Sequence, residues 1–286
     1  MQKSEALLLK GLPVANKILG AVKAEADLFA PHLKSKIKLV VVLVGEDPAS
    51  EVYVSHKIKK CHELGFESEL VRLPSTADET SVVFRIHALN ASSSCHGILL
   101  QLPLPKHLDS RKIVNEIDPR KDVDGLTDQN IGGLVSGSSP IASCTPAGVI
   151  EILNFYELST AKKKSLVIGR SLIVGMPLFH LLSRENSTVT VAHSHTPDLP
   201  AVIKEFDFVF VAAGKPHLFK ASQFKPGAVV VDVGIHRLES GLTGDVDFNC
   251  DHQLKAYTPV PGGVGPLTIA MLMKNTLTLA KLQSAK

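Results

Sequence analysis

Short runs of apolar, mostly β-branched residues alternate along this chain with stretches of helical periodicity. The clearest run is 39–44, followed by a strand-breaking segment at 45–48 and a helical pattern over 50–64. Apolar runs of this kind are typical of strands that are buried on both faces of a parallel sheet. Together, the runs predict strands at about 39–44, 68–73, 97–100, 165–168, 188–192, 207–213 and 228–233. We therefore expect an α/β protein with doubly wound parallel sheets.

The length of 286 residues suggests one large or two ordinary α/β domains. A serine- and glycine-rich segment at 132–140 predicts a boundary between an N-terminal domain, 1–140, and a Rossmann-like second domain, 141–266. We expect a cleft between the two domains. A final helix at about 267–283 is expected to return to the first domain, so that 267–286 belongs with it. The other predicted helices cover about 11–30, 50–64, 78–89, 109–117 and 145–156, with Ser50 and Thr145 as N-cap residues.

Composition excludes several classes of protein. The net charge of +3 is too small and too evenly spread to favour nucleic acid as a partner. Four widely separated cysteines indicate the reduced thiols of a cytoplasmic protein rather than a disulfide framework. Residues 1–5 lack the features of a targeting peptide, and no apolar run reaches membrane-spanning length. No cysteine or acid is spaced to bind a metal with His193 and His195, so we expect no metal site.

A candidate site lies where the first long strand meets its helix, because open α/β sheets bind ligands outside the carboxyl ends of their strands. Tyr53 and Lys57 are four residues apart on that helix, so an aromatic ring and an amine share one face. Spacing alone favours a solvated pair. Gln101 follows the strand at 97–100, where two prolines prevent the strand from continuing. Gln101 is either a simple strand cap or a second polar group of the same site.

Two further turns carry candidate ligand groups. Asp122 and Asp124 lie in the sequence KDVDGL and are either turn formers or ligand-binding acids. Gly262 and Gly263 belong to the glycine-rich segment 261–266, which is either a hinge or a surface of backbone groups for a flat polar ligand. The coincidence of four weak signals at strand carboxyl ends favours one shared cleft.

The segment 166–177 has the strand–turn–helix pattern of a dinucleotide site, with Gly169 ending the strand and Gly175 where the helix must approach the sheet. Its glycine spacing departs from G-x-G-x-x-G, so an ordinary turn is the alternative. The next strand, 188–192, lacks the acid that NAD sites use for the ribose hydroxyl. Arg170 suits a 2′-phosphate instead, which favours NADP over NAD.

These motifs resemble, over nearly the whole chain, the bifunctional methylenetetrahydrofolate dehydrogenase/methenyltetrahydrofolate cyclohydrolase family. Ser143 stands where that family usually has proline. The matching stretches are VGEDPASEVYVSHK (44–57), GILLQLPLP (97–105), KDVDGL (121–126), CTPAG (144–148), GRSLIVGMP (169–177), TVTVAHSHT (188–196), KPGAVVVDVGI (225–235), GDVDF (244–248) and TPVPGGVGPLT (258–268).

The resemblance assigns roles residue by residue. It implies that Lys57 is the catalytic lysine, that Tyr53 stacks on the folate, and that Gln101 orients Lys57. It further implies that Asp124 holds the pterin edge. It implies that the folate cleft is lined by Gly262 and Gly263, and that NADP is contacted by Gly169, Arg170, Ser171, Ser194 and Ile235. A homodimer is also implied by the resemblance alone.

The implied chemistry belongs to one-carbon metabolism and supplies purine biosynthesis. Oxidation of 5,10-methylenetetrahydrofolate needs mainly alignment with NADP. Hydrolysis of the methenyl product to 10-formyltetrahydrofolate needs a proton acceptor, the role expected of Lys57 in a partly buried site beside a cationic substrate. The alternatives are another two-domain NADP dehydrogenase of the shikimate type, or a nucleotide-sensing module without catalysis. Tyr53, Lys57, Gln101 and the KDVDGL sequence argue against both.

Overall fold

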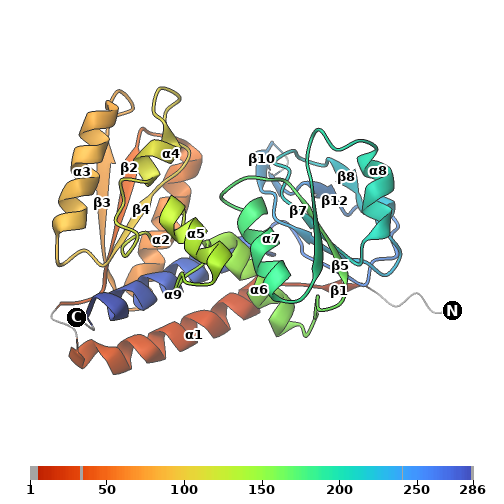
Figure 1. The fold of residues 1–286 in the computed structure, drawn as a ribbon, viewed down its shortest axis with the longest axis horizontal. Coiled ribbons are helices and arrows are strands. Elements are labelled where there is room, and N and C mark those ends of the chain that lie inside the picture. The colour runs from red at the N-terminus through yellow and green to blue at the C-terminus, as the bar shows by residue number, and fades with distance from the viewer. Residues whose placement is uncertain (1–5, 33–34, 240, 285–286) are drawn as a thin grey trace. The chain divides into compact units, whose positions relative to one another are not determined.

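The computed structural model describes residues 6–32, 35–239 and 241–284, so the expectation about residues 1–5 lies outside the described part. The chain divides into two compact units (Figure 1). Unit 1 comprises Met1–Asn16 and Ser143–Ala270, and unit 2 comprises Lys17–Ala142 and Met271–Lys286. The end of the final helix therefore joins the unit formed mainly by the N-terminal half.

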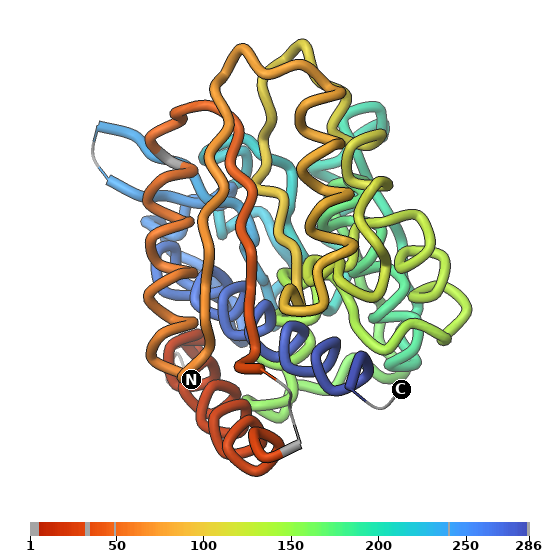
Figure 2. The backbone as a smooth tube through the Cα atoms, turned by 90° about the vertical axis from the view of Figure 1, so that its left-hand side faces the viewer, coloured from red at the N-terminus to blue at the C-terminus, as the bar shows by residue number. Residues whose placement is uncertain are grey.

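Unit 2 contains a parallel three-stranded sheet in the order β3-β2-β4. Its strands are β2 (Lys38–Val44), β3 (Glu67–Leu73) and β4 (Gly97–Leu100). Helix α2 (Pro48–Glu63) connects β2 to β3, and α3 (Glu79–Ala91) connects β3 to β4. The two connections run in opposite directions across the sheet, so right-handed crossovers place the helices on opposite faces. Figure 2 shows both helices running alongside these strands.

Helix α2 begins two residues earlier than predicted. Asp47, not Ser50, is its N-cap residue, and the Asp47 carboxylate accepts a hydrogen bond from the backbone N–H of Ser50 at 2.8 Å. The reason is Pro48, which has no N–H to leave unsatisfied and whose fixed φ suits the first turn of a helix.

Unit 2 contains two further short helices, and the second of them overlaps the predicted boundary segment 132–140. Helix α4 (Ser110–Val114) lies within the predicted helix 109–117, whereas α5 (Asp128–Ser136) was not predicted. Helix α5 ends at Gly137, whose φ of 88° is accessible to glycine at little cost. The chain also forms α1 (Gly11–Phe29), η1 (Ala30–His32) and α9 (Gly265–Ser284), and α1 and α9 each contribute residues to both units.

Unit 1 contains a six-stranded parallel sheet, within the described residues, in the order β1-β13-β9-β7-β5-β6. This confirms the predicted doubly wound parallel sheet. Its strands are β1 (Leu7–Leu8), β5 (Lys164–Ile168), β6 (Thr188–Ala192), β7 (Phe208–Val211), β9 (Val229–Asp232) and β13 (Ala256–Tyr257).

The N-cap residue predicted for helix α6 (Cys144–Phe155) is also wrong. Its N-cap residue is Ser143, so Thr145 lies inside the first turn and its hydroxyl hydrogen-bonds that of Thr268 at 2.9 Å. The other elements of unit 1 are α7 (Gly175–Arg184), α8 (Leu199–Val202), η2 (Ile203–Glu205), η3 (Ala221–Gln223), β8 (Phe219–Lys220), β10 (His236–Leu238), β11 (Gly241–Thr243) and β12 (Val246–Asp247).

Each unit has its own hydrophobic core built from its central strands. Val40, Val42 and Ile98 belong to the core of unit 2, while Leu166 and Val209 belong to that of unit 1. Burial of these side chains supplies most of the stabilisation of each sheet. Within the described ranges, no helix is both long and apolar enough to cross a membrane.

Strand order defines one crevice in each sheet. In unit 2 the chain leaves β2 for β3 on one side and returns to β4 on the other, so the order reverses between β2 and β4. In unit 1 it reverses between β5 and β7 for the same reason. Doubly wound sheets bind their ligands at such reversals, outside the carboxyl ends of the strands.

Candidate functional site

The crevice of unit 2 holds a buried amine paired with a neutral amide. Lys57 Nζ donates to Gln101 Oε1 at 3.0 Å. Gln101 Nε2 donates in turn to the carbonyl of Leu102 at 2.6 Å, which fixes the orientation of the amide and turns its oxygen toward the lysine. Gln101 directly follows β4, and its backbone N–H donates to the carbonyl of Val42 in β2. The strand-end arrangement therefore sets the position of the lysine's partner.

The solvated-pair alternative for Tyr53 and Lys57 is wrong for the lysine. Lys57 is only 8% exposed, and among the described residues it has no carboxylate partner. A buried amine without a counter-ion is costly, so a structural role explains it poorly. Tyr53, one helical turn earlier, is half-buried on the same face of α2.

The two aspartates of KDVDGL lie in different environments. These environments show which aspartate forms the turn and which is available to a ligand. Asp122 is 2% exposed, and its carboxylate accepts hydrogen bonds from Gly125 N, Thr127 N and Asn130 Nδ2 at 2.8–3.0 Å. Burial raises the pKa of Asp122, and the negative charge of Asp124 adds to that rise. Asp122 is therefore the turn former.

Asp124 is half-buried, and its carboxylate makes no hydrogen bond or ion pair to any residue that the structure describes. Asp122 bridges to Ile98 in parallel register, and the N–H of Ile98 donates to the carbonyl of Lys121 at 2.7 Å. Asp124 lies two residues after this bridge to β4, in the turn where the N–H of Gly125 donates to the carbonyl of Asp122 at 3.3 Å. The carboxylate is thus an unused acceptor, among the described residues, in a turn that follows a bridge to the strand preceding Gln101.

At the crevice of unit 1, two glycines each allow the backbone to lie very close to a neighbouring carbonyl group. Gly169 has a φ of +123°, and a Cβ there would lie 2.2 Å from the carbonyl oxygen of Ala212, which follows β7. A Cβ on Gly175, the first residue of α7, would lie 2.1 Å from the carbonyl oxygen of Gly169. Only glycine fits at both positions, as expected of a turn that brings a helix N-terminus close to a bound phosphate.

The residues after Gly169 differ in what they contact. Arg170 is exposed and makes no hydrogen bond or ion pair within the described ranges. The Ser171 hydroxyl accepts from the N–H groups of Val174 and Gly175 at 3.1 and 3.3 Å, so it holds the first turn of α7. Arg170 is therefore available to a ligand, and Ser171 shapes the turn that presents it.

The other predicted cofactor residues lie at the same edge of the sheet. Ser194 follows β6 and Ile235 follows β9, and both are exposed. Because all strands of this sheet are parallel, their carboxyl ends meet at one edge. Gly262 and Gly263 follow β13 in unit 1, where Gly262 O accepts from the N–H of Gly11 at 2.8 Å.

A pair of buried carboxylates that the sequence motifs did not predict lies at this edge. Asp245 accepts from the N–H groups of residues 213–215 after β7 at 2.7–3.0 Å, and from His236 Nε2 at 2.7 Å. Asp232 accepts from the N–H groups of Gly234, Asp245 and Val246 at 2.8–3.1 Å. Together they fix the loops after β7 and β9. An acid inside an apolar segment, as in VVVDV, is the signal that could have identified them.

Asp232 gives unit 1 a measurable pH dependence. Burial raises the pKa of Asp232 from 3.8 to about 6, the charge of Asp245 adds to the rise, and the backbone N–H groups oppose it. The folded state therefore binds this proton more tightly than the unfolded chain. The stabilisation is complete below about pH 4 and is lost as pH rises through about 6, a change of about 3 kcal/mol.

The Asp232→Asn side chain cannot titrate, so the free energy of unfolding of wild type relative to this variant should fall by about 2.5 kcal/mol between pH 4 and pH 7. Denaturant unfolding followed by circular dichroism measures it. A difference independent of pH would show that Asp232 stays ionised throughout.

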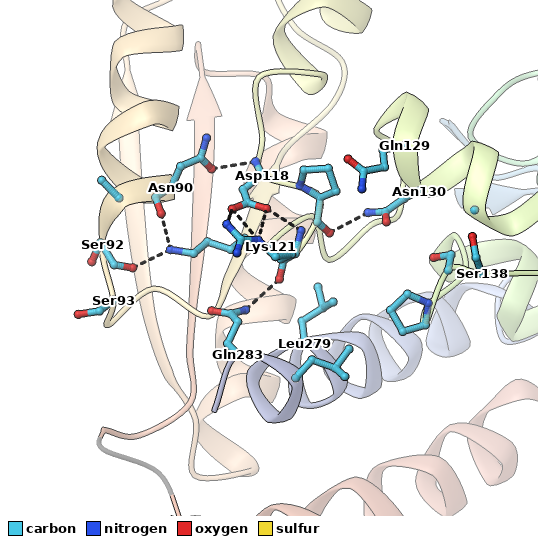
Figure 3. Close-up of a pocket in the computed structure, with 17 residues that line it drawn as sticks. Asn90, Ser92, Ser93, Asp118, Lys121, Gln129, Asn130, Ser138, Leu279 and Gln283 are labelled. Carbon is cyan, nitrogen blue, oxygen red and sulfur yellow. Dashed lines mark hydrogen bonds and ion pairs between the residues drawn. The ribbon is translucent and has the colours of Figure 1, made fainter. Parts of the chain in front are cut away.

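A cavity of about 520 Å³ lies elsewhere in unit 2 (Figure 3). Lys121 Nζ donates there to the carbonyls of Leu89, Asn90 and Ser92, which caps the end of α3. Of the described residues predicted as site residues, none lines this cavity. It is lined by residues 90–93, 118–121, 129–130, 133, 138–140, 279, 282 and 283.

Comparison with known proteins identifies the family. The fold and the close-approach glycine turn place the chain among two-domain α/β enzymes with a dinucleotide site. Residues 9–124 match the catalytic-domain model, and 143–284 the NAD(P)-binding-domain model, of tetrahydrofolate dehydrogenase/cyclohydrolase. The chain belongs to the tetrahydrofolate dehydrogenase/cyclohydrolase family.

Individual relatives match over nearly their full length. The chain is 48% identical to the bifunctional protein FolD of Campylobacter concisus, covering 98% of this chain and 99% of that one. Among solved structures, the bifunctional FolD enzyme of Campylobacter jejuni is 40% identical, with a TM-score of 0.93 over 97% of this chain and 99% of that one. FolD of Trypanosoma brucei, solved with NADP and an inhibitor, is 36% identical, with a TM-score of 0.92 over 98% of each chain.

Proposed function

We propose that this chain oxidises 5,10-methylenetetrahydrofolate to the methenyl form with NADP, and then hydrolyses that product to 10-formyltetrahydrofolate. The observation that carries the proposal is the buried amine of Lys57, held by Gln101 at the ligand-binding edge of unit 2. The names of the relatives, bifunctional dehydrogenases and cyclohydrolases, support it.

The residues of unit 1 fit a bound NADP. The Gly169 turn and the N-terminus of α7 offer backbone N–H groups and a favourable helix dipole to a phosphate. Arg170 has no partner among the described residues, and the end of β6 carries no acid to repel a 2′-phosphate. Ser194 and Ile235 lie at the same edge and complete the proposed contacts. NADP, when bound, accepts the hydride of the first step.

The folate is proposed to bind through its pterin ring, which a carboxylate, an aromatic ring and backbone groups of the protein would contact. Asp124 offers two unused carboxylate oxygens to the N–H donors of the pterin edge, a charge-assisted pairing. Tyr53 offers a ring face for stacking. The backbone groups of Gly262 and Gly263 are proposed to contact the same ligand. In the oxidation step these residues contribute alignment rather than proton transfer.

In the hydrolysis step, water adds to the methenyl carbon, one C–N bond of the five-membered ring breaks, and 10-formyltetrahydrofolate forms. Protons must leave the attacking water and reach the departing pterin nitrogen. Lys57 is proposed to move them, because Gln101 cannot titrate and Asp124 is occupied by the pterin. Gln101 Oε1 keeps the amine in one orientation throughout, since its own amide is fixed on Leu102.

An assay of the purified chain tests the function directly. With methylenetetrahydrofolate and NADP, the absorbance band of reduced nicotinamide should grow, and with methenyltetrahydrofolate alone the methenyl band should decay. A shikimate-type dehydrogenase would do neither with folates, and a sensing module would bind NADP without turnover. Absence of both signals in a folded, NADP-binding sample would refute the proposal.

Arg170→Ala should weaken NADP binding by about 1.5–3 kcal/mol, because a charged hydrogen bond to the 2′-phosphate is lost. NAD lacks that phosphate, so its binding should barely change. Titration of the variant with each cofactor measures both values. Equal losses for NADP and NAD would show that Arg170 does not contact the 2′-phosphate.

We also propose that the enzyme is a cytoplasmic homodimer. Its four cysteines are free thiols, as expected in a reducing compartment. Light scattering of the eluting protein measures its mass, and a value near 30.7 kDa, the mass of one chain, would contradict the dimer.

A further inference from the structure

The turn that carries Asp124 is fixed by groups that do not belong to the proposed ligand site. On its C-terminal side, Asp122 Oδ1 accepts from the N–H of Gly125 at 3.0 Å. Asp122 Oδ2 accepts from the N–H of Thr127 at 2.8 Å and from Asn130 Nδ2 at 2.9 Å. Three donors thus converge on one buried carboxylate, and the N–H of the residue after Asp124 is among them.

The other side of the turn is held from the C-terminal helix. Asn275 of α9 is 4% exposed, and its Nδ2 donates to the carbonyls of Val123 and Ala142, each at 2.9 Å. Val123 directly precedes Asp124. The peptide groups on both sides of Asp124 are therefore fixed, while the Asp124 carboxylate itself has no partner among the described residues.

We propose that Asp122 and Asn275 are positioning residues for folate: they clamp the turn at Val123 and Gly125 so that the Asp124 carboxylate meets the pterin edge in one fixed orientation. This inference rests on the proposed function of Asp124. A carboxylate free to rotate with a loose turn would have to be ordered by each substrate molecule, at a cost in affinity. The clamp orders the Asp124 carboxylate before the substrate binds, so that cost is avoided.

Asp122→Asn tests the inference with almost no change of shape. The amide replaces one acceptor oxygen with a donor, so at least one of the N–H groups of Gly125, Thr127 and Asn130 loses its acceptor. The folate KM of both activities should rise about 10-fold, the scale of one lost hydrogen bond at the ligand. The NADP KM should change less than about 2-fold, since the change lies in unit 2. Asn90→Ala is the matched control, because Asn90 also bonds two backbone groups of unit 2, at Glu116 and Asp118.

A double-mutant cycle separates positioning from general stabilisation. If Asp122 acts through Asp124, the folate KM of the Asp122→Asn/Asp124→Asn protein should equal that of Asp124→Asn alone. A merely structural Asp122 would lower the active fraction and leave the folate KM unchanged. Multiplicative effects of the two substitutions on KM would overturn the inference while leaving the proposed function intact.

Two further outcomes complete the test. An Asp124→Asn protein with a wild-type folate KM would instead overturn the proposed role of Asp124. If Asp122→Asn does not fold, Asn275→Ala in the same cycle addresses the other side of the clamp. It should also raise folate KM only while Asp124 is present, and a folate KM unaffected by Asn275→Ala would contradict the clamp.

Discussion

Lys57→Met is expected to lower cyclohydrolase activity by about 100-fold or more, the usual scale for losing general acid–base assistance. Methionine keeps much of the side-chain length and suits a buried position, but it has no amine. Because Lys57 is only 8% exposed, the substitution should not destabilise the unit. Decay of the methenyl absorbance under saturating substrate measures the effect.

The dehydrogenase activity of the same variant serves as its internal control. Hydride transfer depends on alignment more than on a base, so this activity should fall much less than the cyclohydrolase activity. Gln101→Leu should resemble Lys57→Met in weaker form, because it removes the acceptor that orients the amine. A Lys57→Met protein that hydrolyses methenyltetrahydrofolate at the wild-type rate would contradict the mechanism.

Asp124→Asn is expected to weaken folate binding by about 2–3 kcal/mol and to lower both activities together. The amide places a donor against the N–H donors of the pterin, and both steps share one pterin pocket. Since the Asp124 side chain has no partner within the described part of the chain, no native hydrogen bond is lost. The thermal stability should therefore stay close to that of wild type.

Affinity measurements with each ligand check the prediction. Folate affinity should fall while NADP affinity is unchanged. If the reverse were found, Asp124 would belong to the cofactor site and not to the folate site.

The fold could be predicted from the sequence where periodicity is strong and local. The apolar run at 39–44 and the pattern of the final helix are of this kind, and β2 and α9 confirm both. Helix α5 was missed because Gly132 and Gly133 weaken its pattern, and because Thr127, its N-cap residue, is held by Asp122. Strand β1 was missed because two residues carry no periodicity and its partner, β13, lies far along the chain.

The sequence predicts which residues form the site, but not the burial and the hydrogen-bond partners of their side chains. Spacing places Tyr53 and Lys57 on one helical face, yet burial of the amine depends on the strand end that carries Gln101. Likewise, Asp122 and Asp124 are equivalent as sequence. The conformation of the turn distinguishes them, because three donors from residues 125–130 converge on the Asp122 carboxylate and, among the described residues, none bonds that of Asp124.

The most direct test of the central claim follows both reactions in one sample of the wild-type chain. Methylenetetrahydrofolate and NADP are added, and the nicotinamide and methenyl absorbance bands are recorded together, with Lys57→Met in parallel. Wild type should produce reduced NADP with little methenyl intermediate, whereas Lys57→Met should accumulate the methenyl form as NADP is reduced. Equal accumulation of the methenyl form by both proteins would contradict a bifunctional enzyme whose second step depends on Lys57.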